Sequence, residues 1–232
     1  MATYVNDLRL KEITTGDESG TWGTSTNTNL ELIGEAVSYA TQESFSSDAD
    51  VTTTVADGAA DPARAFYFKV TSSGSLSATR VLTIAPNTIS RVQIIENATS
   101  GSQIITIKQG SGATVNIPNG ETRMVYMDGA GSGAAVVDAL ADINIGGKLT
   151  VGVDDTGYDV KLFGATSGKY WLWDESADGV LQYSSLTVGV DDTGYDVKFF
   201  GATSGAYMLW DESADDLVLA GAAGIDLAGD ID

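Results

Sequence analysis

The side chains best suited to chemistry in this sequence are acidic, because the chain holds 32 aspartate and glutamate residues and neither histidine nor cysteine. A short loop places Asp174, Ser176 and Asp178 at alternate positions before Gly179, as in the first half of a calcium-binding loop. Such a loop needs a bidentate glutamate six positions later, where this chain has Ser185. An acidic turn between two strands therefore explains the motif better, and the three residues stay weak metal candidates.

Adjacent carboxylates raise the question of glycoside hydrolysis, in which two acids flank the scissile bond. Asp174 and Glu175 are neighbours, and neighbours on a strand point to opposite faces of a sheet, so the two cannot flank one substrate. The pairs Asp154–Asp155 and Asp191–Asp192 each stand before Thr-Gly, which is typical of tight turns. The chain also lacks histidine general bases, cysteine nucleophiles and thiolate metal ligands. We therefore predict no enzymatic activity and no cofactor.

These acidic motifs belong to a repeat. The 33 residues that begin at Leu149 return from Leu186, 37 positions later, with 27 identities. A period of this size indicates one supersecondary unit used twice, and such units need neighbours to cover their apolar faces. Two copies are too few to shield each other, so we expect the neighbours to come from other chains of the same protein.

Each repeat is predicted to consist of strands. Alternation places Tyr195, Val197 and Phe199 on one face of a strand and Lys198 and Phe200 on the other. The pattern leaves open which face points inward. We predict that eight residues pack in the core of an intertwined trimer: Tyr158, Phe163, Trp171, Trp173, Tyr195, Phe200, Met208 and Trp210.

A helix is predicted near the N-terminus, over residues 26–41. Polar residues after Trp22 can cap its start, and Leu30, Ile33 and Val37 recur at helical spacing. We name these four residues the helix seam. So narrow a stripe is typical of a short helix that packs against one or two partner helices, although packing on its own domain produces the same pattern.

The middle of the chain is predicted to be a β domain, over residues 49–142. Its runs of β-branched and aromatic residues start about ten residues apart, which is typical of an antiparallel β-sandwich or a partly closed barrel. A junction and the first repeat follow over residues 143–185, and the second repeat and a C-terminal strand over residues 186–232. The seven runs are AFYFKV, RVLTIA, RVQIIE, QIITIK, ATVNI, TRMVYM and AAVVDA.

The charge of the chain limits its partners. The formal net charge is −20, and the segment from Leu149 to Asp232 alone holds 16 acidic and 3 basic residues. Such a field repels nucleic acid, whose binding depends on phosphate neutralisation. The sequence has no run of about 18 apolar residues, so we predict no membrane span.

Three segments together resemble virion structural proteins of tailed phages, in particular tail-fibre-like proteins of marine cyanobacterial phages. The resemblance covers nearly the whole chain, and the repeat is its most specific part. It implies a homotrimeric fibre whose N-terminal part, residues 1–48, attaches to the particle and whose β-rich part forms a shaft or tip. The segments are WGTSTNTNLELIGEA, RVQIIENATSGSQIITIKQGSGATVNIPNGETRMVYMDG and GVDDTGYDVKFFGATSGAYMLWDESADDLVL.

The combined prediction is a mainly β protein with a short N-terminal helix, the sandwich or barrel, and two 37-residue β repeats that form an intertwined trimeric β-prism shaft. Its expected function is that of a tail fibre or fibre adaptor at the virion surface, used in host attachment. Expected partners are copies of itself, other phage tail or capsid proteins, and host surface polysaccharide. The alternatives are a glycan-reading receptor-binding protein and a capsid decoration protein, or head fibre.

Overall fold

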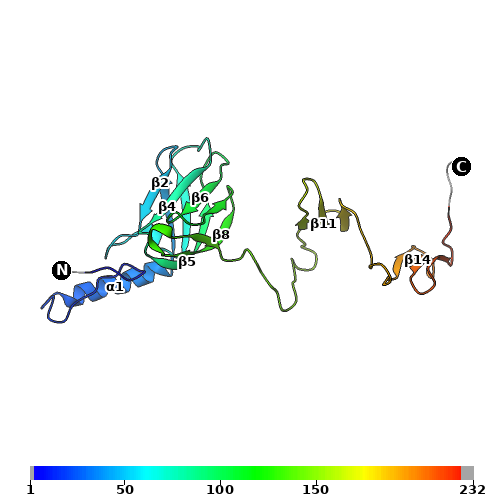
Figure 1. Cartoon of the computed structure of the whole chain (residues 1–232), viewed down its shortest axis with the longest axis horizontal. Helices are drawn as coiled ribbons and strands as arrows, with labels where there is room; N and C mark the ends of the chain where they lie inside the picture. The colour runs from blue at the N-terminus through cyan, green and yellow to red at the C-terminus, as the bar shows by residue number, and fades with distance from the viewer. Residues whose placement is uncertain (1–2, 226–232) are drawn as a thin grey trace. The chain divides into compact units, whose positions relative to one another are not determined.

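The computed structural model describes residues 3–225. The chain divides into two units, Met1–Asn144 and Ile145–Asp232, which are described separately below (Figure 1). The C-terminal strand predicted in GIDLAGDID begins at Gly224, so nearly all of it lies outside the described residues.

The one α-helix of the described residues, α1, spans Trp22–Ala36. It ends five residues earlier than predicted, because Tyr39 already pairs with Tyr67 in a β-ladder. The Ser38 hydroxyl donates to the carbonyl of Glu35 at 2.8 Å and satisfies one of the free carbonyls at the helix end. The helix is too short to cross a membrane, and no other described helix is long and apolar enough to do so.

The first unit contains two sheets, which occupy the left part of Figure 1. Each of the seven predicted runs overlaps one of the strands β3 to β9, whereas β1 and β2 were not predicted. Two short 3-10 helices, Pro62–Arg64 and Gly131–Gly133, lie between strands. The five-stranded sheet has the order β1 (Tyr39–Phe45), β3 (Tyr67–Ser72), β5 (Ser90–Asn97), β8 (Thr122–Asp128), β9 (Val136–Asp138); the four-stranded sheet has the order β2 (Val51–Thr54), β4 (Arg80–Ala85), β6 (Ile105–Lys108), β7 (Val115–Ile117).

The chain crosses from one sheet to the other after each of its first five strands, so strands β1, β3 and β5 pair in parallel, as do β2, β4 and β6. Tyr39 pairs with Tyr67 and Tyr67 with Ile94, so that one circuit takes 28 and then 27 residues. This winding is that of a short β-solenoid. Only the later pairs β5–β8, β8–β9 and β6–β7 are antiparallel.

The prediction of an antiparallel domain is therefore wrong for the parallel pairs, and neither described sheet closes into a barrel. A spacing of about ten residues between strands suits a crossover to the facing sheet as well as a hairpin within one sheet, which is why the sequence did not distinguish them. The sandwich itself is present, because one apolar core joins the two sheets. Phe45 and Phe68 from the five-stranded sheet and Leu82, Ile84 and Ile107 from the four-stranded sheet are fully buried in it.

A buried asparagine links the ends of the two sheets. The Asn97 amide, at the end of β5, donates to the carbonyls of Gln103 at 3.0 Å and of Ile117, in β7, at 2.9 Å. Its oxygen accepts the Thr99 hydroxyl at 2.7 Å. Asn97-Ala98-Thr99 has the pattern of a glycosylation site, but this amide is fully buried and its hydrogen atoms are used inside the fold.

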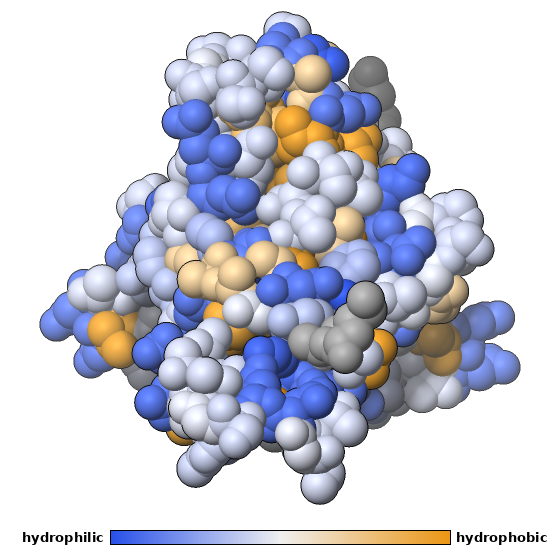
Figure 2. All heavy atoms as spheres, turned by 90° about the vertical axis from the view of Figure 1, so that its left-hand side faces the viewer, coloured by the Kyte–Doolittle hydropathy of each residue, from blue (hydrophilic) through white to orange (hydrophobic). Residues whose placement is uncertain are grey.

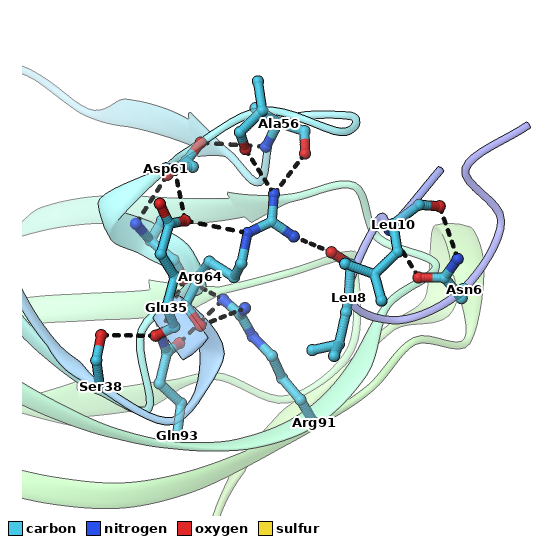
Figure 3. A network of polar contacts seen from close by, with 12 residues as sticks. Asn6, Leu8, Leu10, Glu35, Ser38, Ala56, Asp61, Arg64, Arg91 and Gln93 are labelled. Carbon is cyan, nitrogen blue, oxygen red and sulfur yellow. Dashed lines mark hydrogen bonds and ion pairs between the residues drawn. The ribbon is translucent and has the colours of Figure 1, made fainter. Parts of the chain in front are cut away.

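A buried arginine, Arg64, ties the N-terminal segment and α1 to the sheets (Figure 3). Its guanidinium donates to the carbonyls of Leu8, Ala56 and Ala59, the last two at 2.7 and 2.9 Å. Its Nε lies 3.6 Å from the carboxylate of Glu35, near the end of α1. One side chain thus holds a segment that precedes the helix, the helix end and the loop after β2.

A second arginine lies beside the first. Arg91, in β5, donates to the carbonyls of Ala63 and Arg64 and to the side-chain oxygen of Gln93. Burial lowers the pKa of Arg91 to about 10, and the positive charge of Arg64 acts in the same direction. Both side chains keep their charge at neutral pH, so the backbone carbonyls around them provide the solvation that water no longer supplies.

The loop after β1 supplies a pH-dependent contact. Asp48 accepts hydrogen bonds from Arg80 Nε at 2.7 Å, from the Ser77 hydroxyl at 2.5 Å and from the Ser77 backbone at 3.2 Å. The hydrogen bond from Arg80, followed by that from the Ser77 hydroxyl, holds the pKa of Asp48 well below its ordinary value. The carboxylate is therefore more stable in the folded protein than in the unfolded chain.

We expect the free energy of unfolding of Asp48→Asn to depend less on pH in the acid range than that of the wild type. The pKa of Asp48 is depressed in the folded protein. Its carboxylate therefore contributes fully to stability above the unfolded pKa of about 4, and the contribution is lost as the pH falls towards the folded pKa. Urea unfolding between pH 7 and pH 2 should show the difference between wild type and Asp48→Asn shrinking as the pH drops below about 4. Arg80→Gln should lower the free energy of unfolding by a similar amount, and the double variant should lose no more than either single variant. Additive losses would contradict the coupling between Asp48 and Arg80.

Candidate functional site: two duplicated three-stranded sheets

Each repeat folds into its own antiparallel three-stranded sheet. In both copies the first two strands are joined through a tight turn with a glycine in the left-handed region, Gly168 at φ 74° and Gly205 at φ 79°. Ordinary side chains are strained at such angles. The strands are β10 (Val160–Phe163), β11 (Tyr170–Asp174) and β12 (Gly179–Gln182) in the first copy, and β13 (Val197–Phe200), β14 (Tyr207–Asp211) and β15 (Asp216–Ala220) in the second.

The weak metal candidates form the turn between the second and third strands. Asp174 Oδ1 accepts the backbone N–H groups of Ser176 at 3.1 Å and Ala177 at 3.2 Å, and the Ser176 hydroxyl at 2.7 Å. The Ser176 hydroxyl contributes most to lowering the pKa of Asp174. Asp178 follows in the left-handed region, at φ 47°. The hydrogen bonds of Asp174 are those of an acidic turn. Within residues 3–225 no group of three or more acidic side chains is placed to hold a metal ion.

Register assigns every strand residue of a repeat to one of two faces, because directly paired residues point to the same side of a sheet. We name the faces after the residues that distinguish them. The Trp face carries Val160, Leu162, Trp171, Trp173, Val180 and Gln182 in the first copy, and Val197, Phe199, Met208, Trp210, Leu217 and Leu219 in the second. The Lys face carries Lys161, Phe163, Tyr170, Leu172, Asp174, Gly179 and Leu181 in the first copy, and Lys198, Phe200, Tyr207, Leu209, Asp211, Asp216, Val218 and Ala220 in the second.

The eight residues predicted to share a core do not lie together. Trp171, Trp173, Met208 and Trp210 lie on the Trp faces of their sheets. Phe163 and Phe200 lie on the Lys faces, and Tyr158 and Tyr195 precede the first strand of each sheet. All eight are partly or largely exposed, including Trp210 at 42% and Phe200 at 78%.

On the Lys face, the lysine lies against aromatic rings. Lys161 Nζ is 3.7 Å from the ring centre of Tyr170 and 5.1 Å from that of Phe163. The second copy repeats the arrangement, with Lys198 Nζ 3.6 Å from the ring centre of Tyr207. Cation–π contacts of this kind keep the ammonium group on the sheet surface while leaving it open to water.

The two acidic turns of each repeat meet at one cavity, which the sequence did not reveal. The Glu175 backbone N–H donates to Asp159 Oδ1 at 3.0 Å, and Glu212 N–H donates to Asp196 Oδ1 at 3.1 Å in the second copy. These bonds bring the two turns together in both copies. The cavities measure about 450 and 510 Å³ and are lined in part by Asp154, Asp155, Trp173, Glu175 and Asp178, and by Asp191, Asp192, Trp210, Glu212 and Asp215. The only signal in the sequence is that both acidic motifs recur with the same period.

The helix seam is exposed on α1. Trp22, Leu30 and Ile33 lie on the helix and Val37 at its C-cap, and all four are exposed; the buried residue of the helix is Leu32 instead. On the face of the molecule shown in Figure 2, hydrophobic residues form small patches among hydrophilic ones. The first unit therefore leaves the predicted seam available for contact.

No family model, characterised protein or solved structure matches this chain.

Proposed function

We propose that this chain is a structural virion protein of a tailed phage, a homotrimeric tail fibre or fibre adaptor. In this proposal the N-terminal segment 1–48 attaches to the particle, and the duplicated sheets form a β-rich shaft that serves host attachment. The observation that supports it most is that each repeat is a separate three-stranded sheet with large apolar side chains exposed on it.

A sheet of this kind gains most of its stability from a second layer. Three strands need an apolar face packed on something before they are independently stable. Only Leu172 and Ala206 are buried among the apolar residues described in the second unit. Burying a large apolar side chain contributes about 1.5–3 kcal/mol, so covering several in each of three chains would stabilise the shaft far beyond one chain. Sister chains are the partners that every repeat has available.

The helix seam fits the attachment end in the same proposal. Its apolar residues project from α1, while Lys11 holds the helix to the preceding segment. The Lys11 backbone N–H donates to Asn29 Oδ1 at 3.0 Å, and Asn29 Nδ2 donates back to the Lys11 carbonyl at 2.9 Å. A helix positioned in this way can present its seam to a particle protein without being part of the sheets.

Two measurements test the proposal. Light scattering of the purified full chain at micromolar concentration should give the mass of a trimer, and a monomer would overturn it. Double substitution Leu30→Glu with Ile33→Glu should leave the trimer intact and prevent incorporation into tails. Binding of the unaltered protein to capsids instead, in numbers that follow the shell lattice, would indicate a decoration protein.

The paired cavities favour a second candidate function, glycan reading. A tryptophan wall offers a platform for a sugar ring, and carboxylates accept hydrogen bonds from its hydroxyl groups. A sugar can enter only if Trp173 and Trp210 stay accessible in the assembled protein. Quenching of their fluorescence by host polysaccharide, lost in Asp155→Asn with Asp192→Asn, would support glycan reading. Fluorescence that does not respond to polysaccharide would argue against it.

A further inference from the structure

We propose that the Trp face of each repeat is the surface through which copies of this chain contact one another, and that the Lys face stays in water. This inference rests on the proposed homotrimer and decides which of the two faces lies inside it.

The two faces differ in charge. Every charged side chain on the strands of the two sheets lies on the Lys face, including Lys161 and Lys198, and none lies on the Trp face. Within the described residues, neither lysine has a carboxylate within ion-pair distance. Burial of an unpaired ammonium group is costly, whereas the strands of the Trp face carry no charged side chain and meet carboxylates only at the cavities beside Trp173 and Trp210.

The substitutions between the two copies also indicate that the Trp face is packed. Leu162 faces Trp171 in the first sheet, and the same pair becomes Phe199 and Met208 in the second. The large ring is on the central strand in the first sheet, as Trp171, and on the neighbouring strand in the second, as Phe199. The pair is therefore bulky and apolar in both copies. Packed surfaces require compensation of this kind, because volume lost at one position must be regained beside it.

The Lys face of the first copy covers the middle of its own apolar surface, although Phe163 in β10 is 76% exposed. The rings of Tyr170 and Tyr183 lie 4.6 Å apart, and Lys161 extends over Tyr170. Leu172, in the middle of this face, is only 8% exposed. The Trp face has no such cover of polar side chains, since its residues in the second sheet are all apolar.

The occupant that fits this face is a second copy of the chain. The segment from Leu149 to Asp232 carries 16 acidic and 3 basic residues, so two copies repel each other least when they meet through strands without carboxylates. The strands of the Trp face offer that surface. A cationic partner would instead be drawn to the acidic cavities that Trp173 and Trp210 border.

The test uses two neighbouring phenylalanines. Phe199 lies on the Trp face and is 57% exposed, and Phe200 lies on the Lys face and is 78% exposed. In the full-length protein, Phe199→Glu should abolish the trimer seen by light scattering, while Phe200→Glu should leave it intact. Loss of the trimer in Phe200→Glu alone, or its retention in both variants, would overturn the assignment of faces. A monomeric wild type would instead overturn the proposed function.

A second pair of variants answers the concern that a buried glutamate prevents folding. Because the chain has no cysteine, a single introduced thiol can be followed cleanly. In the assembled protein, the thiol of Phe199→Cys should react slowly with a maleimide and that of Phe200→Cys rapidly. Equal reactivity of the two thiols in a trimeric protein would contradict the proposal.

Discussion

Replacement of Arg64 with alanine is expected to lower the free energy of unfolding of the first unit by about 3–5 kcal/mol, because a large buried side chain and its polar contacts are lost together. The Arg64 side chain is 0% exposed. Its removal leaves the carbonyls of Leu8, Ala56 and Ala59 without their donors and the Glu35 carboxylate without its counter-ion. These acceptors are partly buried, so water replaces the lost donors only in part, and the losses at several acceptors add up.

The control is another arginine of the same unit. Arg123 pairs with Glu121 at 2.7 Å, but its side chain is 41% exposed, so Arg123→Ala should cost less than about 1 kcal/mol. Hydrogen exchange of peptides from the two sheets, measured in increasing urea, would report both changes without interference from the repeats. Arg64→Ala should also expose the segment before α1 to proteases. Equal effects of the two substitutions would contradict the role given to Arg64.

The strands of the β domain were largely predictable, and their pairing was not. Strands β3 to β9 coincide with runs of β-branched and aromatic residues, whose alternation is a local property of the sequence. The first strand was hidden because Ala40 continues the helical spacing of Leu30, Ile33 and Val37, and its pairing with β3, 28 residues away, decided its state. Parallel order is likewise a non-local property, since the same turns permit a hairpin or a crossover.

The repeats show the same division between local and non-local information. Alternation correctly separated Val197 and Phe199 from Lys198 and Phe200. It did not relate one strand to the next, so Phe163 was grouped with Trp171 and Trp173, although register places it on the opposite face. The meeting of the two acidic turns depends on the hydrogen bond between Glu175 and Asp159, which no spacing rule predicts.

The other large effect is expected from Trp210. In the assembled protein Trp210→Ala should cost roughly 3–5 kcal/mol per chain, the range for removing a buried aromatic side chain, and it should loosen the trimer. In the single chain the ring is 42% exposed, so in the proposed trimer much of that loss would come from contacts with sister copies. The effect should therefore grow with protein concentration, because a substitution at an interface acts through the association equilibrium.

Thermal unfolding at several protein concentrations separates this effect from a local one. Wild type should unfold at higher temperature as its concentration rises, and Trp210→Ala should lose that dependence. Phe200→Ala, on the Lys face of the same sheet, is the matched control and should keep the dependence, because its ring is 78% exposed and outside the proposed contact. If Trp210→Ala and Phe200→Ala shift the midpoint equally at every concentration, Trp210 stabilises only its own sheet. The duplicated sheets would then not assemble through their Trp faces.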